Sequence, residues 1–462
     1  MSKKDVKTFK LNQLFIEESK DDLISLGKKR RKKYPIEEVS DFKPVKRDVV
    51  KLIKATEDKM IPELIDMRHQ RMNQNVFSYY RATAGIMEGD LEKQVSTHIP
   101  VIICGDAHLT NFGFFASPER KLMFGLNDFD EAHVDNWEFD LKRLMTSVAL
   151  IGRIDGLKEE EISEILKNTS HAYRRGIKYA NSLQLLDRYY LSFKVDDLIS
   201  QADPDSQMYK VLSKVASKAP KNNSDKVVKK FTELGPDGQL RFKENPPRAR
   251  HISQKLYDQL SNGLREYQKT TSDDVRVLLV NYRLTDLIRY SVGVGSWGTR
   301  CYLALLTGKD NSHLVLQIKE AMPLRYNMSV LSRNESQDLE SGEGRRIITA
   351  QRVLQTFYDP FLGSMKVNDR SFYIRQFRDM KDSIDPLRLD KEGFEEYAYA
   401  CAFILSIAHF QSPTAPMIYG YTHKQKNFDT GMAKWATDYA NQVQNDYVSF
   451  NNYLRGEVED DQ

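Results

Sequence analysis

Short apolar blocks and longer stretches of helical periodicity alternate along the chain, so both strands and helices are expected. The segment "HIPVIICG" (98–105) holds a continuous apolar run and is typical of a buried strand. In "LNDFDEAH" (126–133) the end of a second strand is closed by two carboxylates. In residues 135–154, apolar side chains recur at three- and four-residue spacing, which predicts a helix.

The second half of the chain has a stronger strand pattern. Residues 274–321 alternate β-branched and aromatic residues between turn signals, so an antiparallel sheet is expected to begin near Asp274. "SFYIRQF" (371–377) predicts a further strand, and "GFEEYAYACAFILSIAHF" (393–410) is the last clear helix. Between the halves, residues 222–250 are loop-rich and predict a boundary that can hold a hairpin. The fold class expected from this pattern is α+β.

Length, charge and cysteine content narrow the class of protein. The 462 residues are enough for two or three domains, and a net charge of only +4 gives no general reason to expect nucleic acid as a partner. Three scattered cysteines form neither a disulfide framework nor a zinc motif. The first residues lack the apolar core of a signal peptide, and no apolar run approaches the roughly 18 residues that span a bilayer. We therefore expect a cytoplasmic protein with no membrane partner.

A basic run, "KKRRKK" at Lys28–Lys33, and two arginines among apolar residues could bind phosphate groups. The run is not interleaved with aromatic residues that would stack on bases. A solvated helix face is therefore the favoured interpretation, and nucleic acid is not the expected partner. For the arginines, Arg68 and Arg81, a structural role that anchors carboxylates is favoured over phosphate binding.

Polar side chains follow the two predicted strands of the first half, and their spacing indicates chemistry. Asp106 and Asn111 are five positions apart, as in the kinase catalytic loop, where the Asp accepts the proton of the attacking hydroxyl and the Asn binds magnesium. Asp128 ends the next strand, where the second magnesium-binding carboxylate of such sites lies. Because Mg²⁺ prefers oxygen ligands and keeps several waters, one Asp, one Asn and the nucleotide phosphates suffice.

Two other interpretations of these residues remain open. In a purely structural account, Asp106 caps a helix and Asp128 closes a turn. "GDAH" (105–108) also resembles metal-dependent phosphoesterases, with His108 as a ligand. Those enzymes need further His and Asn ligands, as in a "GNH" segment, and the chain has no such segment.

A glycine-rich turn in the second half favours a nucleotide site. "GVGSWG" (293–298) has the G-x-G-x-x-G spacing, which a dinucleotide-binding turn shares, but such a turn must open a helix and "TRCYLALLTG" (299–308) predicts a strand. A second strand, "HLVLQIKEA" (313–321), carries Lys319 near its end, and this arrangement covers the phosphates in kinases. The alternative for Lys319 is an exposed lysine at a strand end. The predicted nucleotide-binding residues are Gly293, Gly295, Ser296, Gly298 and Lys319.

Several long segments carry a family resemblance. They include "CGDAHLTNFGFFASPERKLMFGLNDFDEA", "EFDLKRL", "VGVGSWGTRCYLALL" and "FYIRQFRDMKDS". On these segments the chain resembles the uncharacterised bacterial family called domain of unknown function 2252, over nearly all residues beyond the first two dozen. The family name implies no activity.

Shorter motifs are similar to those of aminoglycoside and choline phosphotransferases of the kinase-like superfamily. "CGDAHLTN" resembles their "HGDxHxxN" loop, and "NDFD" resembles their "IDFD/E" strand end. The resemblance implies ATP and Mg²⁺ as cofactors and Asp106 as general base. It also implies Asn111 and Asp128 as magnesium ligands, Asp130 as an auxiliary ligand or structural residue, and Asp140 as a support of the catalytic loop.

The order of the motifs is reversed relative to kinases, in which the glycine turn and lysine come first. A two-lobed, kinase-like fold that is circularly permuted and carries helical insertions accounts for this order. The expected divisions are a basic N-terminal extension (1–60), the catalytic-loop half of the helical C-lobe (61–220), a β-rich nucleotide-binding N-lobe (221–385) and C-terminal helices that complete the C-lobe (386–462).

The expected function is an ATP- and magnesium-dependent phosphotransferase acting on a hydroxyl of an unknown acceptor, either a small molecule or a protein. Lys319 should pair with a glutamate of the next helix, and the candidates there are Glu335, Glu340 and Glu343, with Gln351 as another polar candidate. A non-catalytic, nucleotide-binding pseudokinase is the alternative.

Overall fold

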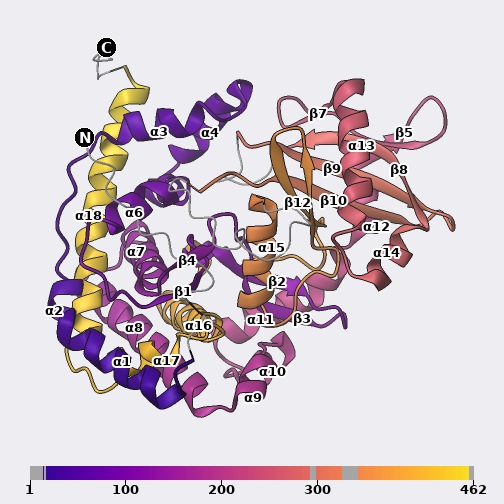
Figure 1. Ribbon diagram of the computed structural model, residues 1–462. Coiled ribbons are helices and arrows are strands. Elements are labelled where there is room, and N and C mark those ends of the chain that lie inside the picture. Colours follow the sequence, from indigo (N-terminus) through magenta and orange to yellow (C-terminus); the bar gives the residue numbers. More distant parts are fainter. Residues whose placement is uncertain (1–13, 15–16, 292–297, 325–341, 457–462) are drawn as a thin grey trace.

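Helices and antiparallel strands build the protein, and this mixture confirms the expected α+β class. The computed structural model describes residue 14 and residues 17–291, 298–324 and 342–456. The first and last helices gather on one side, and a large sheet lies on the other (Figure 1). The α-helices are α1 (Lys20–Lys33), α2 (Ile36–Val39), α3 (Val49–Glu57), α4 (Ile65–Met72), α5 (Val76–Arg81), α6 (Ala84–Leu91), α7 (Glu138–Ile154), α8 (Glu159–Ser182), α9 (Leu185–Tyr189), α10 (Val195–Gln201), α11 (Gln207–Lys218), α12 (Ser224–Phe231), α13 (Gln254–Gln268), α14 (Asp273–Leu279), α15 (Glu343–Leu354), α16 (Lys391–His409), α17 (Pro416–Thr422) and α18 (Phe428–Leu454).

Among the described residues, the strands form one six-stranded antiparallel sheet and three two-stranded pairs. The large sheet has the order β11-β12-β10-β9-β8-β7, and the pairs are β1 with β4, β2 with β3, and β5 with β6. The strands are β1 (Pro100–Ile103), β2 (Phe112–Ala116), β3 (Leu122–Leu126), β4 (His133–Asn136), β5 (Thr232–Leu234), β6 (Leu240–Phe242), β7 (Ala249–His251), β8 (Tyr282–Tyr290), β9 (Cys301–Gly308), β10 (His313–Glu320), β11 (Gly363–Val367) and β12 (Arg370–Gln376).

Alternating side chains allow the large sheet to bury both faces. On β9, Tyr302 and Ala304 pack in the cluster of α13 and α14, whereas Leu303 packs with α12 on the opposite face. Successive strand residues point to opposite faces. On β10, Val315 shares the α12 face, so Lys319, four residues on, lies on that face as well. Lys319 therefore lies on the face of the sheet that carries α12, and not on the face that carries α13.

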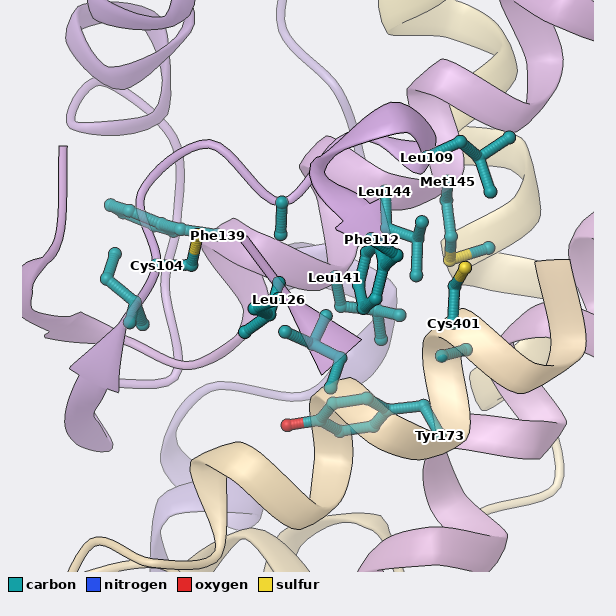
Figure 2. Close-up of a cluster of buried hydrophobic side chains, with 14 of the residues drawn as sticks. Cys104, Leu109, Phe112, Leu126, Phe139, Leu141, Leu144, Met145, Tyr173 and Cys401 are labelled. Atoms are coloured by element: carbon teal, nitrogen blue, oxygen red, sulfur yellow. The ribbon is translucent and has the colours of Figure 1, made fainter. Parts of the chain in front are cut away.

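We call α1–α11 and α16–α18, with the short strands β1–β4, the helical part of the protein. Its hydrophobic core lies around α7. Leu141 and Met145 of α7 are fully buried with Phe112 of β2, Tyr173 of α8 and Cys401 of α16, and Figure 2 shows these side chains together. Burying an aliphatic or aromatic side chain of this size stabilises a fold by about 1.5–3 kcal/mol. The loop between β1 and β2 thus rests on a rigid, closely packed base.

The end of α16 lies beside β1, although more than 300 residues separate them in sequence. Ser412 Oγ accepts a hydrogen bond from the backbone N–H of Ile102 at 2.9 Å, and the Thr414 hydroxyl donates to the carbonyl of Pro100. The Tyr397 hydroxyl of α16 donates to the Leu109 carbonyl at 2.9 Å. The C-terminal helices and the loop after β1 therefore form one structural unit.

Two glycines let α1 cross closely over α17. A Cβ atom at Gly27 would lie 2.0 Å from the carbonyl oxygen of Met417, and one at Gly420 would lie 2.1 Å from that of Ile24. Arg31 Nη1 also donates to the carbonyl of His423 at 2.8 Å. Glycine is required here because any side chain would force the two backbones apart.

The structure differs from the sequence expectations at the start of the sheet. The segment at Asp273–Leu279 forms α14, and the sheet strand begins only at Tyr282. Val275 and Leu279, four residues apart, are buried against the sheet, whereas Val277 is 69% exposed. This is helical spacing, which the run of β-branched residues obscures.

Two further differences concern the first and last elements. α17 and α18 follow the expected last helix, and α18 buries Trp435 and Tyr439 between polar residues that weaken its apolar pattern. The two predicted strands that precede the aspartates do not pair with each other, since β1 pairs with β4 and β3 pairs with β2. None of the described helices is both long and apolar enough to cross a lipid bilayer.

Candidate active site

Asp140, in the first turn of α7, holds the loop that follows β1. Its carboxylate accepts hydrogen bonds from the backbone N–H groups of Cys104 (2.7 Å) and Gly105 (2.9 Å). His409 Nε2, at the end of α16, lies 3.0 Å from Asp140 Oδ2, and the Tyr173 hydroxyl lies 2.8 Å from His409 Nδ1. These buried contacts fix the backbone immediately before Asp106, as the resemblance implied for Asp140.

Gly105 allows the sharp turn of this loop. Its φ of +78° lies in the left-handed region, and a Cβ atom there would meet the carbonyl oxygen of Glu131 at 2.2 Å. The loop and the turn after β3 therefore touch through this glycine.

Asp106 is a buried carboxylate with a guanidinium beside it. Arg143 of α7 donates through Nε to Asp106 Oδ1 at 2.8 Å, and its Nη2 donates to the Tyr80 carbonyl at 2.8 Å. Burial raises the pKa of Asp106 to about 6, although Arg143 favours the charged form. His108 Nε2 lies 3.5 Å from Asp106 Oδ2. Asp106 is thus ionised at neutral pH and still basic enough to accept a proton.

Asn111 joins the loop after β1 to the turn after β3. Its side-chain N–H groups donate to the carbonyls of Asp106 (2.9 Å) and Asp128 (3.0 Å). Its Oδ1 accepts from the backbone N–H of Asp128 at 2.8 Å. An amide oxygen has two lone pairs, so one remains for a further ligand.

The lysine of β10 meets the aspartates of the first half. Lys319 Nζ lies 3.2 Å from Asp128 Oδ2 and forms an ion pair with Asp130. The Lys319 side chain is only 4% exposed, whereas that of Asp128 is 46% exposed. The strand lysine and the predicted magnesium ligand Asp128 are therefore in direct contact, although 191 residues separate them in sequence.

This cluster distributes its charge unevenly. Burial would raise the pKa of both carboxyl groups, but for Asp128 the charge of Lys319 outweighs it and the pKa is lowered. The pKa of Asp130 is raised by burial and by Asp128. The pKa of Glu131 is raised well above its ordinary value for the same two reasons, burial and the neighbouring carboxylates. Added positive charge would therefore be favourable at Asp130 and Glu131.

The predicted phosphate turn is only partly described. Gly293, Gly295 and Ser296 lie outside the described residues. Gly298 has a φ of +99°, and its carbonyl accepts from the Ile61 N–H at 2.8 Å. The last residue of the turn is thus hydrogen-bonded to the segment between α3 and α4.

The predicted glutamate partner of Lys319 is not found among the described residues. Glu335 and Glu340 lie outside them, and Glu343 forms an ion pair with Arg346 at 2.6 Å. Gln351 of α15 donates to Gln355, which directly follows the helix. The ion pairs of Lys319 in the described chain are those with the aspartates.

A cavity of about 310 Å³ opens beside the aspartates, between the helical part and the end of the sheet. Asp106, Asp128 and Asp130 line it together with Arg68 and Arg81. Arg68 fits the structural role expected for it, since its Nη2 donates to the Ala82 carbonyl at 2.9 Å and its Nε lies 3.4 Å from the carboxylate of Glu57.

The structural role does not satisfy every nitrogen of either arginine, since Nε and Nη1 of Arg68 are buried with no hydrogen-bond partner among the described residues. Arg81 shares this feature. Its Nε is buried with no hydrogen-bond partner in the described part of the chain. Burial lowers its pKa, while Asp106 and Asp128 oppose that effect. Arg81 lines the cavity together with both aspartates, and an anionic group bound there could satisfy it.

The residues expected to hold magnesium fit that ion in part. Asp130 Oδ1 is buried without a hydrogen-bond partner among the described residues, and Asp128 is half exposed at the cavity. Within the same residues, no group of three or more His, Cys, Asp or Glu side chains is arranged to hold a metal. Two carboxylates and one amide oxygen, completed by phosphate oxygens and water, match the ligand habit of Mg²⁺.

A family model described as "Uncharacterized protein conserved in bacteria (DUF2252)" matches residues 60–453. The chain belongs to the DUF2252 family. The matched region includes every candidate site residue of this DUF2252 protein and begins after α1–α3. Searches of curated proteins and of solved structures found no match.

Two arginines near Asp106 in this DUF2252 protein were not predicted as part of the candidate site. Arg143 appears in the sequence as one charge in a helical repeat, and only its burial (2% exposed) marks it. Arg81 was noted for its apolar surroundings, but its proximity to the aspartates depends on the packing of α5. A buried arginine at an apolar helix position was the available signal for both.

Proposed function

We propose that this protein is a kinase-like phosphotransferase, which moves the γ-phosphoryl group of ATP to a hydroxyl of an acceptor in the presence of Mg²⁺. The observation that carries the proposal is the ion pairing of Lys319 with Asp128 and Asp130, two aspartates that line one cavity together with Asp106. A lysine on a strand, a loop Asp with an Asn five residues on, and a second Asp are the parts that phosphoryl transfer uses in kinases.

The topology supports the proposal independently of the site residues. The strand that carries Lys319 is followed by α15, and two further strands complete the sheet, as expected for a kinase N-lobe. The proposed circular permutation requires the helix at 391–409 to support the catalytic loop, and His409 contacts Asp140 beneath that loop.

Each residue would have a distinct task in the reaction. The acceptor hydroxyl oxygen forms a new bond to the γ-phosphorus, the bond from that phosphorus to ADP breaks, and the hydroxyl proton passes to the carboxylate of Asp106. Lys319 would exchange its contact with Asp128 for phosphate oxygens. Asp128, Asp130 and Oδ1 of Asn111 would hold Mg²⁺, which neutralises phosphate charge when it is bound.

A non-catalytic nucleotide-binding protein is the second candidate. It is favoured by the pairing of Glu343 with Arg346, because active protein kinases need an ion pair between the strand lysine and a glutamate of the next helix. Both candidates expect a rise in melting temperature with ATP that depends on magnesium, since a ligand bound only to the folded state stabilises it.

Asp106→Asn separates the two candidates. For the phosphotransferase we expect this variant to keep the ATP-dependent rise in melting temperature and to lose phosphate release, or transfer to an acceptor found by screening metabolite extracts. Asp155→Asn, at the exposed far end of α7, is the matched control and should retain both. If the wild type binds ATP and Mg²⁺ but neither releases nor transfers phosphate, the second candidate is correct. If neither ATP nor Mg²⁺ changes the melting temperature, both fail.

A further inference from the structure

A second concave surface, separate from the catalytic cavity, is formed by α8 and the end of α17. It encloses about 520 Å³ and is lined by Arg174, Arg175 and Lys178 of α8 and by His423 and Lys424. Helical spacing places the three α8 cations on one face of that helix. None of the residues that line the catalytic cavity lines this surface.

Most of this positive charge is not neutralised by the protein itself. Arg174 is paired with Asp429, with Nε 2.9 Å from Oδ1. In the part of the chain that the structure describes, no ion pair involves Arg175, Lys178 or Lys424, and all three side chains are exposed. Like charges held close together repel one another, so a bound anion would relieve the repulsion.

The close crossing of α1 over α17 brings the basic run beside this surface, because Arg31 Nη1 donates to the carbonyl of His423, which lines it. Burial and the charges of Lys424, Lys178, Arg31 and Lys28 all lower the pKa of His423, so cations of three elements act on one imidazole. Lys28 and Arg31 belong to the "KKRRKK" run. The fold therefore joins the basic run to the basic face of α8, which the sequence order does not indicate. Figure 1 shows α1, α17 and α8 side by side.

Aromatic rings that the basic run lacks in sequence are supplied by the other two helices. Tyr179 of α8 lines the surface and is 43% exposed. Tyr419 of α17 also lines it and stacks on His423, with ring centroids 4.7 Å apart. Cations that follow a backbone and aromatic rings that accept a base are the two components of sites for single strands.

We propose that the surface formed by α8 and the end of α17, beside the basic run of α1, binds single-stranded nucleic acid. The unpaired cations contact phosphates, and Tyr179 offers a ring for base stacking. A lipid bilayer fits less well, because the surface is concave and its lining lacks exposed aliphatic side chains. The volume is that of a small-ligand cleft, so extended nucleotides fit and a duplex does not.

The test measures the affinity of the full chain for fluorescein-labelled oligouridine and oligothymidine of about 12 nucleotides by fluorescence anisotropy. If about four phosphates are neutralised, raising the salt from about 50 to 200 mM should weaken binding about 50-fold. The triple variant Arg175→Glu, Lys178→Glu, Lys424→Glu should lose binding. Its matched control, Lys214→Glu, Lys218→Glu, Lys255→Glu, changes the net charge equally at exposed sites on α11 and α13 and should bind as the wild type does.

Tyr179→Leu tests the stacking component and should weaken binding by about 5- to 150-fold while the salt dependence persists. The proposal is overturned if the triple variant binds as tightly as its control, or if Tyr179→Leu has no effect and inorganic polyphosphate binds equally well. It is also overturned if vesicles with phosphatidylserine bind through these residues and the oligonucleotides do not. A preference between oligouridine and oligothymidine decides whether RNA or DNA is the ligand class.

Discussion

Asp106 shows how the surroundings of a single residue raise its pKa. Burial favours the neutral acid, and the guanidinium of Arg143 at 2.8 Å favours the carboxylate. The balance places the pKa at about 6, close enough to neutrality for proton transfer. For Asp128 the outcome is the opposite, because its ion pair with Lys319 lowers its pKa and keeps it charged.

This balance predicts a pH dependence. The carboxylate of Asp106 is the basic form, so phosphate release from ATP should be half-maximal near pH 6, reach its plateau about one pH unit higher and fall about tenfold per unit well below pH 6. Removing the guanidinium with Arg143→Gln takes away a group that lowers the pKa of Asp106, so the acid limb should move to higher pH. The pH profile of kcat measures both effects. Arg153→Gln, on the same helix and paired with Glu159, should leave the limb in place, and an unchanged limb in Arg143→Gln would contradict this account.

At the scale of elements, the hydrogen bonds of Asp140 connect α7, α16 and the loop after β1. Asp140→Asn should lower the free energy of unfolding by about 1.5–3 kcal/mol, because one amide group cannot accept from both N–H groups that the carboxylate now satisfies. Urea unfolding measures the change. Asp155→Asn at the exposed end of α7 should shift the midpoint little. Equal stability of the two variants would mean that the loop does not depend on Asp140.

The crossing of α1 and α17 gives a second prediction for elements. Gly420→Leu should release α1, because even a Cβ atom would overlap the carbonyl of Ile24. Hydrogen exchange across residues 20–33 should then rise relative to the wild type. Ser449→Leu adds the same side chain at an exposed position of α18 and should leave α1 protected. If the amides of α1 stay protected from exchange in Gly420→Leu, the close crossing is not needed to keep α1 packed on α17.

Periodicity predicted most of the elements, and it failed where burial and polarity do not alternate clearly. β9, β10, β12 and α16 were expected close to where they are found. In α14 the β-branched residues resemble a strand, and in α18 alanines and aromatic rings lie among polar residues. For the candidate site, spacing identified Asp106, Asn111 and Lys319, but the contacts of Arg143 and His409 depend on packing between distant elements, which no local pattern contains.

For the whole molecule, Lys319 is a connection between the large sheet and the helical part. Lys319→Met should leave two carboxylates without their cation and increase hydrogen exchange across residues 127–132. The loss of stability should be smaller than the roughly 3–5 kcal/mol of a fully buried pair, since Asp128 is half exposed. Lys366→Met, at an exposed position of β11, is the control and should leave that exchange unchanged. An unchanged exchange rate in Lys319→Met would show that other contacts hold the two parts together.

The support of β1 by Ser412 and Thr414 has a consequence for the order of events during synthesis. When the ribosome has added Asn111, both Asp106 and Asn111 have been made, but Ser412 and Thr414, which support β1, are still untranslated. The nascent N-terminal half therefore lacks contacts that it needs to reach its folded structure. Contacts between residues so far apart in sequence also slow folding. The loop that carries Asp106 and Asn111 would therefore become ordered only after Ser412 and Thr414 have left the exit tunnel and packed against β1.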